Sequence, residues 1–333
     1  MVEMNENLQK LAADFAQGRN AFAGKFIFEY SYIAPACALV ATTKNAQTDV
    51  TKIKECKKII QREFSVFSEV RGMAMMFIAS MLALRDDPEV FVKDLHATYT
   101  NLRKEFMASP FLPLAAYMIA EQISPVKRDE VVERSKAVYK LMKKEHWVLT
   151  SSEDCTYAVM LAMSGMREEQ IIEKTSGYYD ILKKLFKWHP NHVQTMSHVL
   201  AMTDGYDESK CQKIRDIFDA LKKRKTTFGT EYELPTLSIL AMLDEDTDTI
   251  ADKIVAVDKY LKSCRGFGFW GVGSRQRRMY AGILVAIDGL GGESSTALCN
   301  TAMTSVINII IAIEIAICCS VIASTTRSSS SSS

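Results

Sequence analysis

A short apolar phrase recurs along the chain and limits what the chain can fold into. The phrase is a pair or triplet of large apolar residues that ends in, or encloses, a small one. It occurs at Leu39-Val40-Ala41, Met81-Leu82-Ala83, Met118-Ile119-Ala120, Leu161-Ala162-Met163, Leu200-Ala201-Met202, Leu240-Ala241-Met242 and Leu284-Val285, and its small residue steps by 37 to 44 residues. A period of about 40 residues is typical of arrays of helical hairpins, whose units stack into one continuous core.

A second marker keeps the same period. An aromatic residue follows the apolar phrase by 16 to 19 residues and lies in a charged amphipathic segment. The aromatic positions are Tyr99, Tyr139, Tyr179, Phe218 and Tyr260, with steps of 39 to 42 residues. Since two independent markers repeat together, chance is a poor explanation.

Each unit therefore contains two helices of different character. The helix with the aromatic marker is amphipathic: Ile171, Tyr178 and Leu182 fall at helical spacing, while Glu168 and Lys183 lie outside that stripe. The helix with the small residue is apolar on every side, as expected for a helix packed between its own partner and two neighbouring units.

The predicted fold is all-α, with about six and a half hairpin repeats of about 40 residues in an open α-solenoid or a closed α/α toroid. Residues 1–290 form this single helical-repeat domain. The apolar helices are predicted near 70–84, 111–123, 152–164, 192–203, 234–243 and 275–288. The amphipathic helices are predicted near 49–65, 88–106, 127–145, 167–187, 207–224 and 246–264.

Composition excludes several classes of function. The net charge of +1 gives no overall attraction to nucleic acid, and we expect no nucleic-acid partner. The eight cysteines show no CxxC spacing and are expected to be reduced. Glu3 and Glu6 lie where a signal peptide would be cationic and then apolar, so we predict a cytoplasmic location. No cofactor motif is recognised, and no phosphate-binding GxxxxGK[ST] loop occurs.

Stacked hairpins place the two kinds of loop on opposite edges of the array. Acidic residues such as Asp244-Glu245-Asp246 precede the amphipathic helices, and lysines such as Lys183-Lys184 end them. Two explanations stay open: complementarity to the helix dipoles, worth about 0.3–1 kcal/mol per charge, or a cationic rim for an anionic ligand.

The loops that follow the amphipathic helices are rich in aromatic residues, and they contain the predicted binding site. The residues chosen for it are Trp147, Trp188, His189, Phe267, Trp270, Arg275 and Arg278. Tryptophan and arginine are typical of binding hot spots, and arginine forms bidentate pairs with carboxylates and phosphates. The partner would be a protein or an anionic small molecule. No catalytic residue is assigned, and without an HExxH motif no metal site is predicted.

The C-terminal segment is different. Residues 291–327 are predicted to form an apolar helix, and within it residues 302–324 contain Asn308 and Glu314 as their only strongly polar side chains. Twenty-three residues could span a bilayer, but a carboxylate at mid-span is costly. The favoured roles are therefore a cap on the open end of the array or pairing with another subunit. Residues 328–333, all serine, are predicted to be disordered.

Several of these motifs together resemble a bacterial family of uncharacterised proteins, domain of unknown function 4003. The resemblance lies in the Leu-Ala phrases, the Tyr-x6-Phe spacing of Tyr99 to Phe106, the loop at residues 147–151 and the Phe-Gly-Phe-Trp segment at residues 267–270. It covers almost the whole chain and implies no activity, cofactor or catalytic residue.

Two functions from different classes fit this description. One is a helical-repeat scaffold that binds a partner through its basic, aromatic-rich edge. The other is an enzyme with an α/α-toroid fold, whose active site would lie at the mouth formed by the same loops; this rests on fold analogy alone. A deep pocket with perturbed acids or histidines would favour the enzyme.

Overall fold

The computed structural model describes residues 4–26, 33–72, 74–187, 189–203, 205–268 and 271–290. Within these ranges the chain forms fourteen α-helices and two short 3-10 helices, and no strand. The all-α prediction is therefore confirmed. The predictions for residues 291–333, including the apolar helix and the serine tail, lie outside the described residues.

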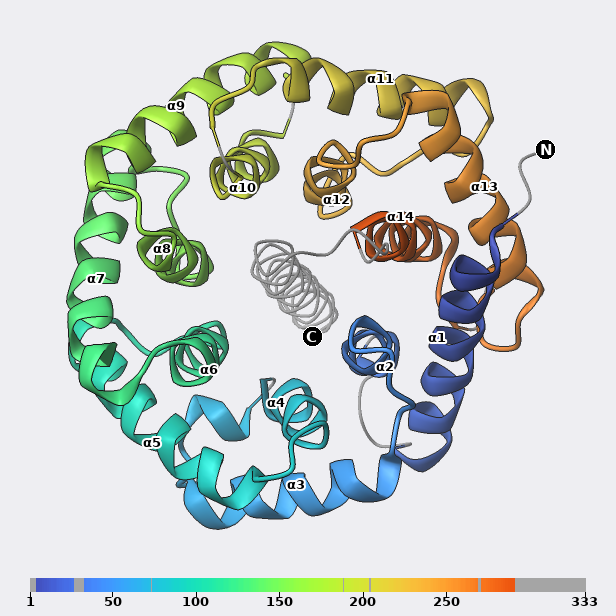
Figure 1. The fold of residues 1–333 in the computed structure, drawn as a ribbon. Coiled ribbons are helices and arrows are strands. Elements are labelled where there is room, and N and C mark those ends of the chain that lie inside the picture. The colour runs from blue at the N-terminus through green and yellow to red at the C-terminus, as the bar shows by residue number, and fades with distance from the viewer. Residues whose placement is uncertain are drawn as a thin grey trace, which may run out of the picture.

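The helices lie in two concentric layers (Figure 1). The outer helices are α1 (Glu6–Lys25), α3 (Val50–Glu63), α5 (Pro88–Glu105), α7 (Arg128–Glu145), α9 (Glu168–Leu185), α11 (Ser209–Lys223) and α13 (Thr247–Ser263). The inner helices are α2 (Ile33–Thr43), α4 (Ala74–Leu82), α6 (Leu112–Gln122), α8 (Asp154–Met163), α10 (Pro190–Ala201), α12 (Leu234–Leu240) and α14 (Ser274–Leu290). The 3-10 helices η1 (Glu69–Arg71) and η2 (Pro125–Lys127) lie in connections between the layers.

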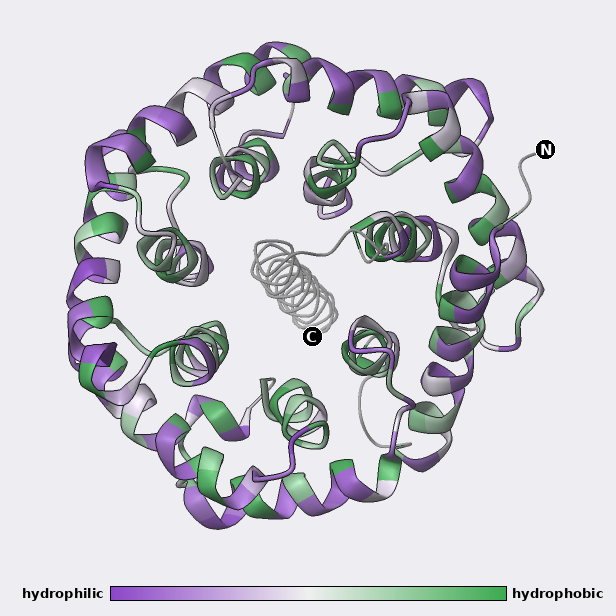
Figure 2. Ribbon diagram, viewed as in Figure 1, coloured by the Kyte–Doolittle hydropathy of each residue, from purple (hydrophilic) through white to green (hydrophobic). Residues whose placement is uncertain are grey.

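The two layers follow from the two hydrophobic patterns. Outer helices carry both hydrophilic and hydrophobic residues (Figure 2), and in α9 the buried positions Ile171, Tyr178 and Leu182 are those of the apolar stripe. In the inner helix α6, every residue from Leu112 to Ala120 is buried. The amphipathic helices therefore separate solvent from an inner layer that is buried along most of its length.

All twelve helices predicted from the repeat are present, with ends that differ by a few residues. The largest shift at a helix start is in α4, which begins at Ala74 because η1 occupies residues predicted as its first turn. The structure also contains two helices outside the predicted ranges, α1 and α2, of which only α2 includes an apolar phrase, Leu39-Val40-Ala41. Helix α1 pairs with α2, so the described chain holds seven outer–inner pairs instead of about six and a half units.

Neighbouring outer helices are joined by a recurring aromatic contact. An aromatic residue or histidine just after one outer helix packs on the marker ring of the next outer helix, and after α5, α7 and α9 it lies seven residues beyond the marker of its own helix. These contacts, which we call the aromatic ladder, are Phe64–Tyr99 (6.1 Å between ring centroids), Phe106–Tyr139 (5.5 Å), His146–Tyr179 (4.4 Å) and Phe186–Phe218 (5.5 Å). Tyr99 and Tyr179 are buried, and Tyr139 and Tyr260 are partly buried against the core.

The same contact joins the two ends of the described array. Phe267, seven residues after Tyr260, lies 5.6 Å from Phe15 of α1. Helix α1 packs against both α13 and α14, and the side-chain amides of Asn5 and Asn7 donate to the carboxylate of Asp288 at 3.0 and 2.7 Å. The first outer helix is thus the neighbour of the last one (Figure 1).

No helix within the described ranges is both long and apolar enough to cross a membrane. The alternative of membrane contact concerned residues 302–324, which lie outside those ranges.

Candidate binding edge

The connections from each outer helix to the following inner helix form one edge of the array, which we call the basic edge. Five of the eight large hydrophobic side chains that are exposed in the described residues lie on it. They are Val66, Phe67, Met107, Trp147 and Val148, in the connections after α3, α5 and α7. Since these helices are consecutive neighbours, the five side chains follow one stretch of this edge. The other three, Val90, Val126 and Tyr206, lie toward the opposite edge.

Lysines border this apolar stretch. Lys143 and Lys144 end α7, and Lys184 and Lys187 lie at or just beyond the end of α9; all four are exposed. Within the described part of the chain, none of the four forms an ion pair. Their position at helix C-termini agrees with the dipole explanation, and their free ammonium groups leave the edge cationic.

Arg275, one of the predicted site residues, is paired within the chain. Its Nε lies 2.7 Å from Oε1 of Glu233 and its Nη2 lies 3.0 Å from Oε2, a bidentate pair, and Nη2 also lies 3.1 Å from Glu231. The Glu233 carboxylate is fully buried at the start of α12. The hydrogen bonds to Glu233 raise the pKa of Arg275 further above its ordinary value. This guanidinium therefore neutralises a buried carboxylate.

Gly229 makes room for that pair. A β-carbon at this position would lie 2.0 Å from the carboxyl carbon of Glu233. The glycine in the connection between α11 and α12 thus has a specific packing reason. Arg278, the second predicted arginine, donates from Nη1 to the carbonyl oxygen of Thr227 at 2.8 Å, in the same connection. Both arginines hold α14 to the segment before α12.

The other predicted site residues are spread over the edge. Phe267 is 2% exposed because it contacts Phe15, so its role in the described structure is packing. Trp147 is 75% exposed, in the connection after α7. The hairpins α9–α10 and α11–α12 separate it from the α14 arginines (Figure 1). Trp188 and Trp270 lie outside the described residues. The predicted residues that the structure describes therefore occupy one edge, but Trp147 and the arginines do not share a compact site.

His189 lies close to the Arg275 cluster. Its ring centroid is 6.4 Å from that of His192, a residue not included in the predicted site. Burial lowers the pKa of His192, and the nearby His189 lowers it further, whereas Glu231 and Glu233 oppose the shift. This shift favours the neutral form of His192. The repeat could have indicated this neighbourhood, because His192 and Glu233 both lie at the N-terminal ends of consecutive inner helices.

A second buried polar pair lies one unit earlier. Nδ1 of His198 on α10 is 3.5 Å from Oδ1 of Asp154 on α8, and both side chains are 3% exposed or less. Burial raises the pKa of Asp154 to about 8 and lowers that of His198 to about 3. The distance would suit an ion pair, but desolvation disfavours both charges, so we assign both groups as neutral. Asp154 Oδ2 also accepts from the amide of Ser151 at 2.7 Å.

The described residues contain no group of three or more His, Cys, Asp or Glu side chains arranged to hold a metal ion. Their cysteines are free thiols: Cys37, Cys56, Cys155 and Cys211 are buried and Cys264 is partly buried. Burial raises the pKa of the Cys155 thiol to about 12, so it is not ionised at neutral pH.

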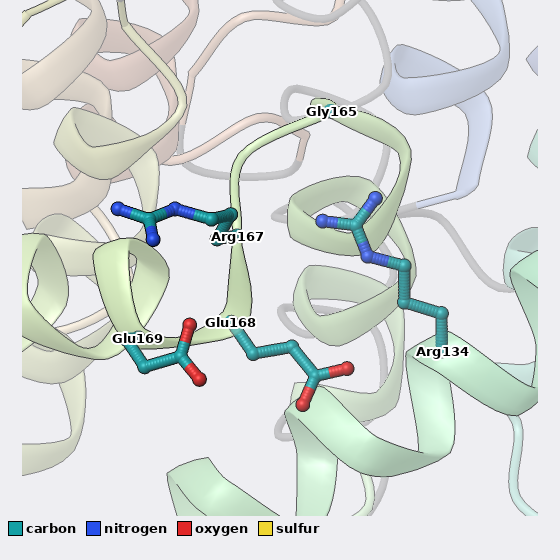
Figure 3. A pocket seen from close by; sticks show the side chains of 5 residues that line it. All are labelled: Arg134, Gly165, Arg167, Glu168 and Glu169. Atoms are coloured by element: carbon teal, nitrogen blue, oxygen red, sulfur yellow. The ribbon is translucent and has the colours of Figure 1, made fainter.

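An open pocket of about 370 Å³ lies on the opposite edge, where α8 leads into α9 (Figure 3). It is lined by Arg134, Gly165, Arg167, Glu168 and Glu169. Arg134 donates to the carbonyl oxygen of Met166, and Gly165 has a φ of +77° that favours glycine. Its two arginines and two glutamates give the lining no excess charge of either sign, so it does not select an anion or a cation.

Comparison with known proteins places this architecture in a family. The family model described as protein of unknown function, DUF4003, matches residues 20–316. This match confirms the resemblance drawn from the Leu-Ala phrases and the Tyr-x6-Phe helices. No curated protein and no solved structure matches the chain significantly. The chain therefore belongs to the DUF4003 family of proteins of unknown function.

Proposed function

We propose that the chain is a closed α/α toroid that acts as an interaction scaffold, and that it binds an acidic protein segment along its basic edge. The contacts of α1 with α13 and α14 support closure, because an open solenoid would leave its terminal helices apart. Seven outer–inner pairs then present seven equivalent positions on each edge.

The observation that carries this proposal is the exposed apolar stretch of the basic edge. Single exposed hydrophobic residues are normal, but Phe67, Met107 and Trp147 lie in three consecutive units. Neighbouring helices are about 8–10 Å apart, so three units cover roughly 16–20 Å. Lys143 and Lys144 next to Trp147 would pair with acidic groups beside apolar anchors. The proposed partner is therefore a peptide segment that alternates Asp or Glu with large apolar residues.

The test uses defined peptides. Twelve-residue peptides selected from a random displayed library against the full chain are expected to be rich in Asp or Glu next to Trp, Phe or Leu. Binding of a selected, labelled peptide would be measured by fluorescence anisotropy. Because apolar anchors dominate such interfaces, we expect Phe67→Ser with Trp147→Ser to weaken binding at least tenfold. Lys143→Glu with Lys144→Glu should weaken it severalfold, and more at low salt.

Matched controls come from the other edge. Val90 and Val126 are 66% and 90% exposed there, and Lys127 is also exposed. Val90→Ser with Val126→Ser, and Lys127→Glu, should leave peptide affinity unchanged. Equal losses of peptide affinity from the substitutions on the two edges would contradict the proposal. Binding of the chain to vesicles containing phosphatidylserine, lost in the Trp147 variant while no acidic peptide is selected, would assign the edge to a membrane surface instead.

Trp147 is the predicted site residue on which this proposal depends most. Binding through His189, Trp188, Trp270, Arg275 and Arg278 stays a prediction, since a partner would meet Arg275 already paired with Glu233. The enzyme alternative would need solvent to reach perturbed groups. Asp154 and His198 are such groups, but they are enclosed in the inner layer, so we propose the scaffold.

A further inference from the structure

The exposed hydrophobic side chains of the two edges lie in the same sector of the array. In the hairpin α3–α4, Phe67 lies on the basic edge and Val90 lies on the opposite edge, at the start of α5. In the hairpin α5–α6, Met107 and Val126 have the corresponding positions. In the hairpin α7–α8, Trp147 lies on the basic edge and the open pocket lies where α8 leads into α9. Each of these three consecutive hairpins therefore offers a contact surface at both of its ends.

The other hairpins lack this pairing. Within the described ranges, the hairpins α1–α2, α11–α12 and α13–α14 expose no large hydrophobic side chain at either edge. The hairpin α9–α10 exposes only Tyr206, toward the edge opposite the basic edge. Since the side chains exposed on the two edges fall in matching hairpins, one edge of a molecule would match the other edge of a second molecule placed directly above it.

The edge opposite the basic edge, which is formed by the connections from each inner helix to the next outer helix, we call the acidic edge. Asp87 and Glu89 are exposed there beside Val90, and Asp207 is exposed beside Tyr206. Acidic groups next to exposed apolar side chains are the composition proposed above for the partner of the basic edge. The chain therefore carries both halves of such an interface.

The pocket on the acidic edge suits an aromatic ring with a cation beside it. Figure 3 shows one guanidinium group and one carboxylate on each side of the segment from Gly165 to Glu168, those of Arg134 and Arg167 and of Glu168 and Glu169. Within the described residues, neither glutamate forms an ion pair. Guanidinium groups stack on aromatic faces, and tryptophan is the best ring for this contact. A mixed lining that selects no simple ion can thus bind an indole and a neighbouring ammonium group together.

We propose that the partner of the basic edge is a second copy of this chain, which places its acidic edge on the basic edge of the first. Trp147 of one copy enters the pocket of the next, and Lys143 and Lys144 beside it pair with the glutamates of the lining. Because Trp147 and the pocket both lie near α7, successive copies stack with little rotation, and the exposed side chains of the neighbouring hairpins then meet as well. The inference rests on the proposed toroid and on the proposed binding of acidic segments by its basic edge, and it names the partner.

A contact between opposite edges does not close on itself. Each added copy leaves one basic edge and one acidic edge free, so the stack is open-ended and grows with protein concentration. Because the two edges carry opposite charge and are exposed, the contact weakens as salt is raised. A two-fold symmetric dimer would instead use the same edge of both copies and stop at two.

Sedimentation velocity of the full chain over a range of protein concentrations tests this stacking. We expect species larger than a dimer at high concentration, and a return to monomer at high salt. Val90→Ser with Val126→Ser should weaken self-association at least tenfold, because apolar anchors dominate such contacts. The same double substitution leaves the affinity for a selected peptide unchanged, so this variant separates self-association from peptide binding.

Charge reversal on each edge gives a second test. Lys143→Glu with Lys144→Glu should weaken self-association at least tenfold, and so should Glu168→Lys with Glu169→Lys. An equimolar mixture of the two variants should regain the wild-type association, because each reversed edge then meets an edge of opposite charge. Restored association also shows that both variants are folded.

A matched control changes the net charge equally, away from both edges. Lys58 in α3 and Lys140 in α7 are exposed on the outer helices, between the two edges. Lys58→Glu with Lys140→Glu should associate as wild type does. Loss of self-association in this control, equal to the loss in the reversal on the basic edge, would overturn the proposal.

The remaining outcomes separate this inference from the proposed function. A chain that stays monomeric at every concentration, while a selected acidic peptide binds its basic edge, would overturn the second copy as partner and leave the proposed function standing. Dimers that do not grow, acidic-edge variants that associate as wild type, or a mixture that fails to regain association would equally overturn it. Open-ended association without selection of any acidic peptide would support the second copy and remove a separate acidic protein as the partner.

Discussion

At the residue scale, the Asp154–His198 pair makes stability depend on pH. Between about pH 6.5 and 8, folded Asp154 keeps its proton, while in the unfolded chain its pKa is near 3.8 and the proton is lost. The folded state then binds more protons, so the free energy of unfolding falls as pH rises, by up to about 1.4 kcal/mol per unit. His198, with a folded pKa of about 3 against 6.5, has the opposite slope between those values and offsets Asp154 below pH 6.5.

Asp154→Asn should remove the alkaline part of this dependence. The asparagine oxygen can still accept from the Ser151 amide, and its amino group can face His198. We therefore expect the melting temperature of wild type to fall relative to Asp154→Asn between pH 6.5 and 8, with parallel curves above pH 8.5. As a control, Asp244→Asn in the turn before α13 should leave the wild-type slope intact. A difference in melting temperature between wild type and Asp154→Asn that stays constant from pH 6.5 to above pH 8.5 would contradict the assigned protonation states.

The sequence indicated on which edge of the array the predicted site residues lie, but not which side chains they contact. Arg275 and Phe267 lie on the basic edge, as their position in the repeat predicts, because the period of the repeat determines which edge each loop occupies. Their partners, Glu233 and Phe15, lie 42 and 252 positions away in the chain. Which side chains meet depends on the crossing of neighbouring helices, and hydrophobic periodicity does not determine it. An arginine expected to be free for a ligand is therefore found paired with a buried carboxylate.

At the element scale, the hydrophobic period and the aromatic marker predicted twelve helices, and α1 shows where this method failed. The segment 6–25 has no apolar phrase before it and only Lys25 in its last turn, whereas a lysine pair ends α7, α9 and α11. A signal was nevertheless present: Phe15 and Phe22 have the same seven-residue spacing as Tyr99 and Phe106. The aromatic spacing is thus a better marker of outer helices than the charged ends.

The two layers should respond differently to added volume. Ala158 in the inner helix α8 is fully buried, and a leucine there would overpack the inner layer by roughly 1–3 kcal/mol. Ala97 in the outer helix α5 is exposed, so Ala97→Leu should change the free energy of unfolding by less than about 0.5 kcal/mol. Urea unfolding of both variants measures the contrast. Equal small effects would mean that the inner helices have a free face.

At the scale of the whole molecule, the proposed closure would make the two ends of the described array structurally central. Phe267 and Phe15 repeat a contact found at four other junctions between outer helices. In an open array the terminal units fray first and their contacts contribute little to global stability. In a closed one, the junction between α13 and α1 is equivalent to any other.

Alanine substitutions at two junctions compare these cases. Phe267→Ala at the joining junction and Phe106→Ala in the middle of the array remove rings that are 2% and 6% exposed. Each is expected to cost about 3–5 kcal/mol, as for other buried phenylalanines, because both junctions are needed for one cooperative unit. Urea unfolding monitored by circular dichroism gives the two values. A cost below about 1 kcal/mol for Phe267→Ala alone would show that the ends are only loosely joined.

The contact between Phe15 and Phe267 also sets a waiting time during synthesis. The ribosome must add 252 residues after Phe15 before its partner exists, which at about 5–20 residues per second takes roughly 13–50 s. Throughout that interval the apolar face of α1 has no neighbour on one side and is open to chaperones or to other nascent chains. Slowing translation late in the message would lengthen this interval without changing a single residue, and would lower the yield of folded protein while leaving its melting temperature unchanged.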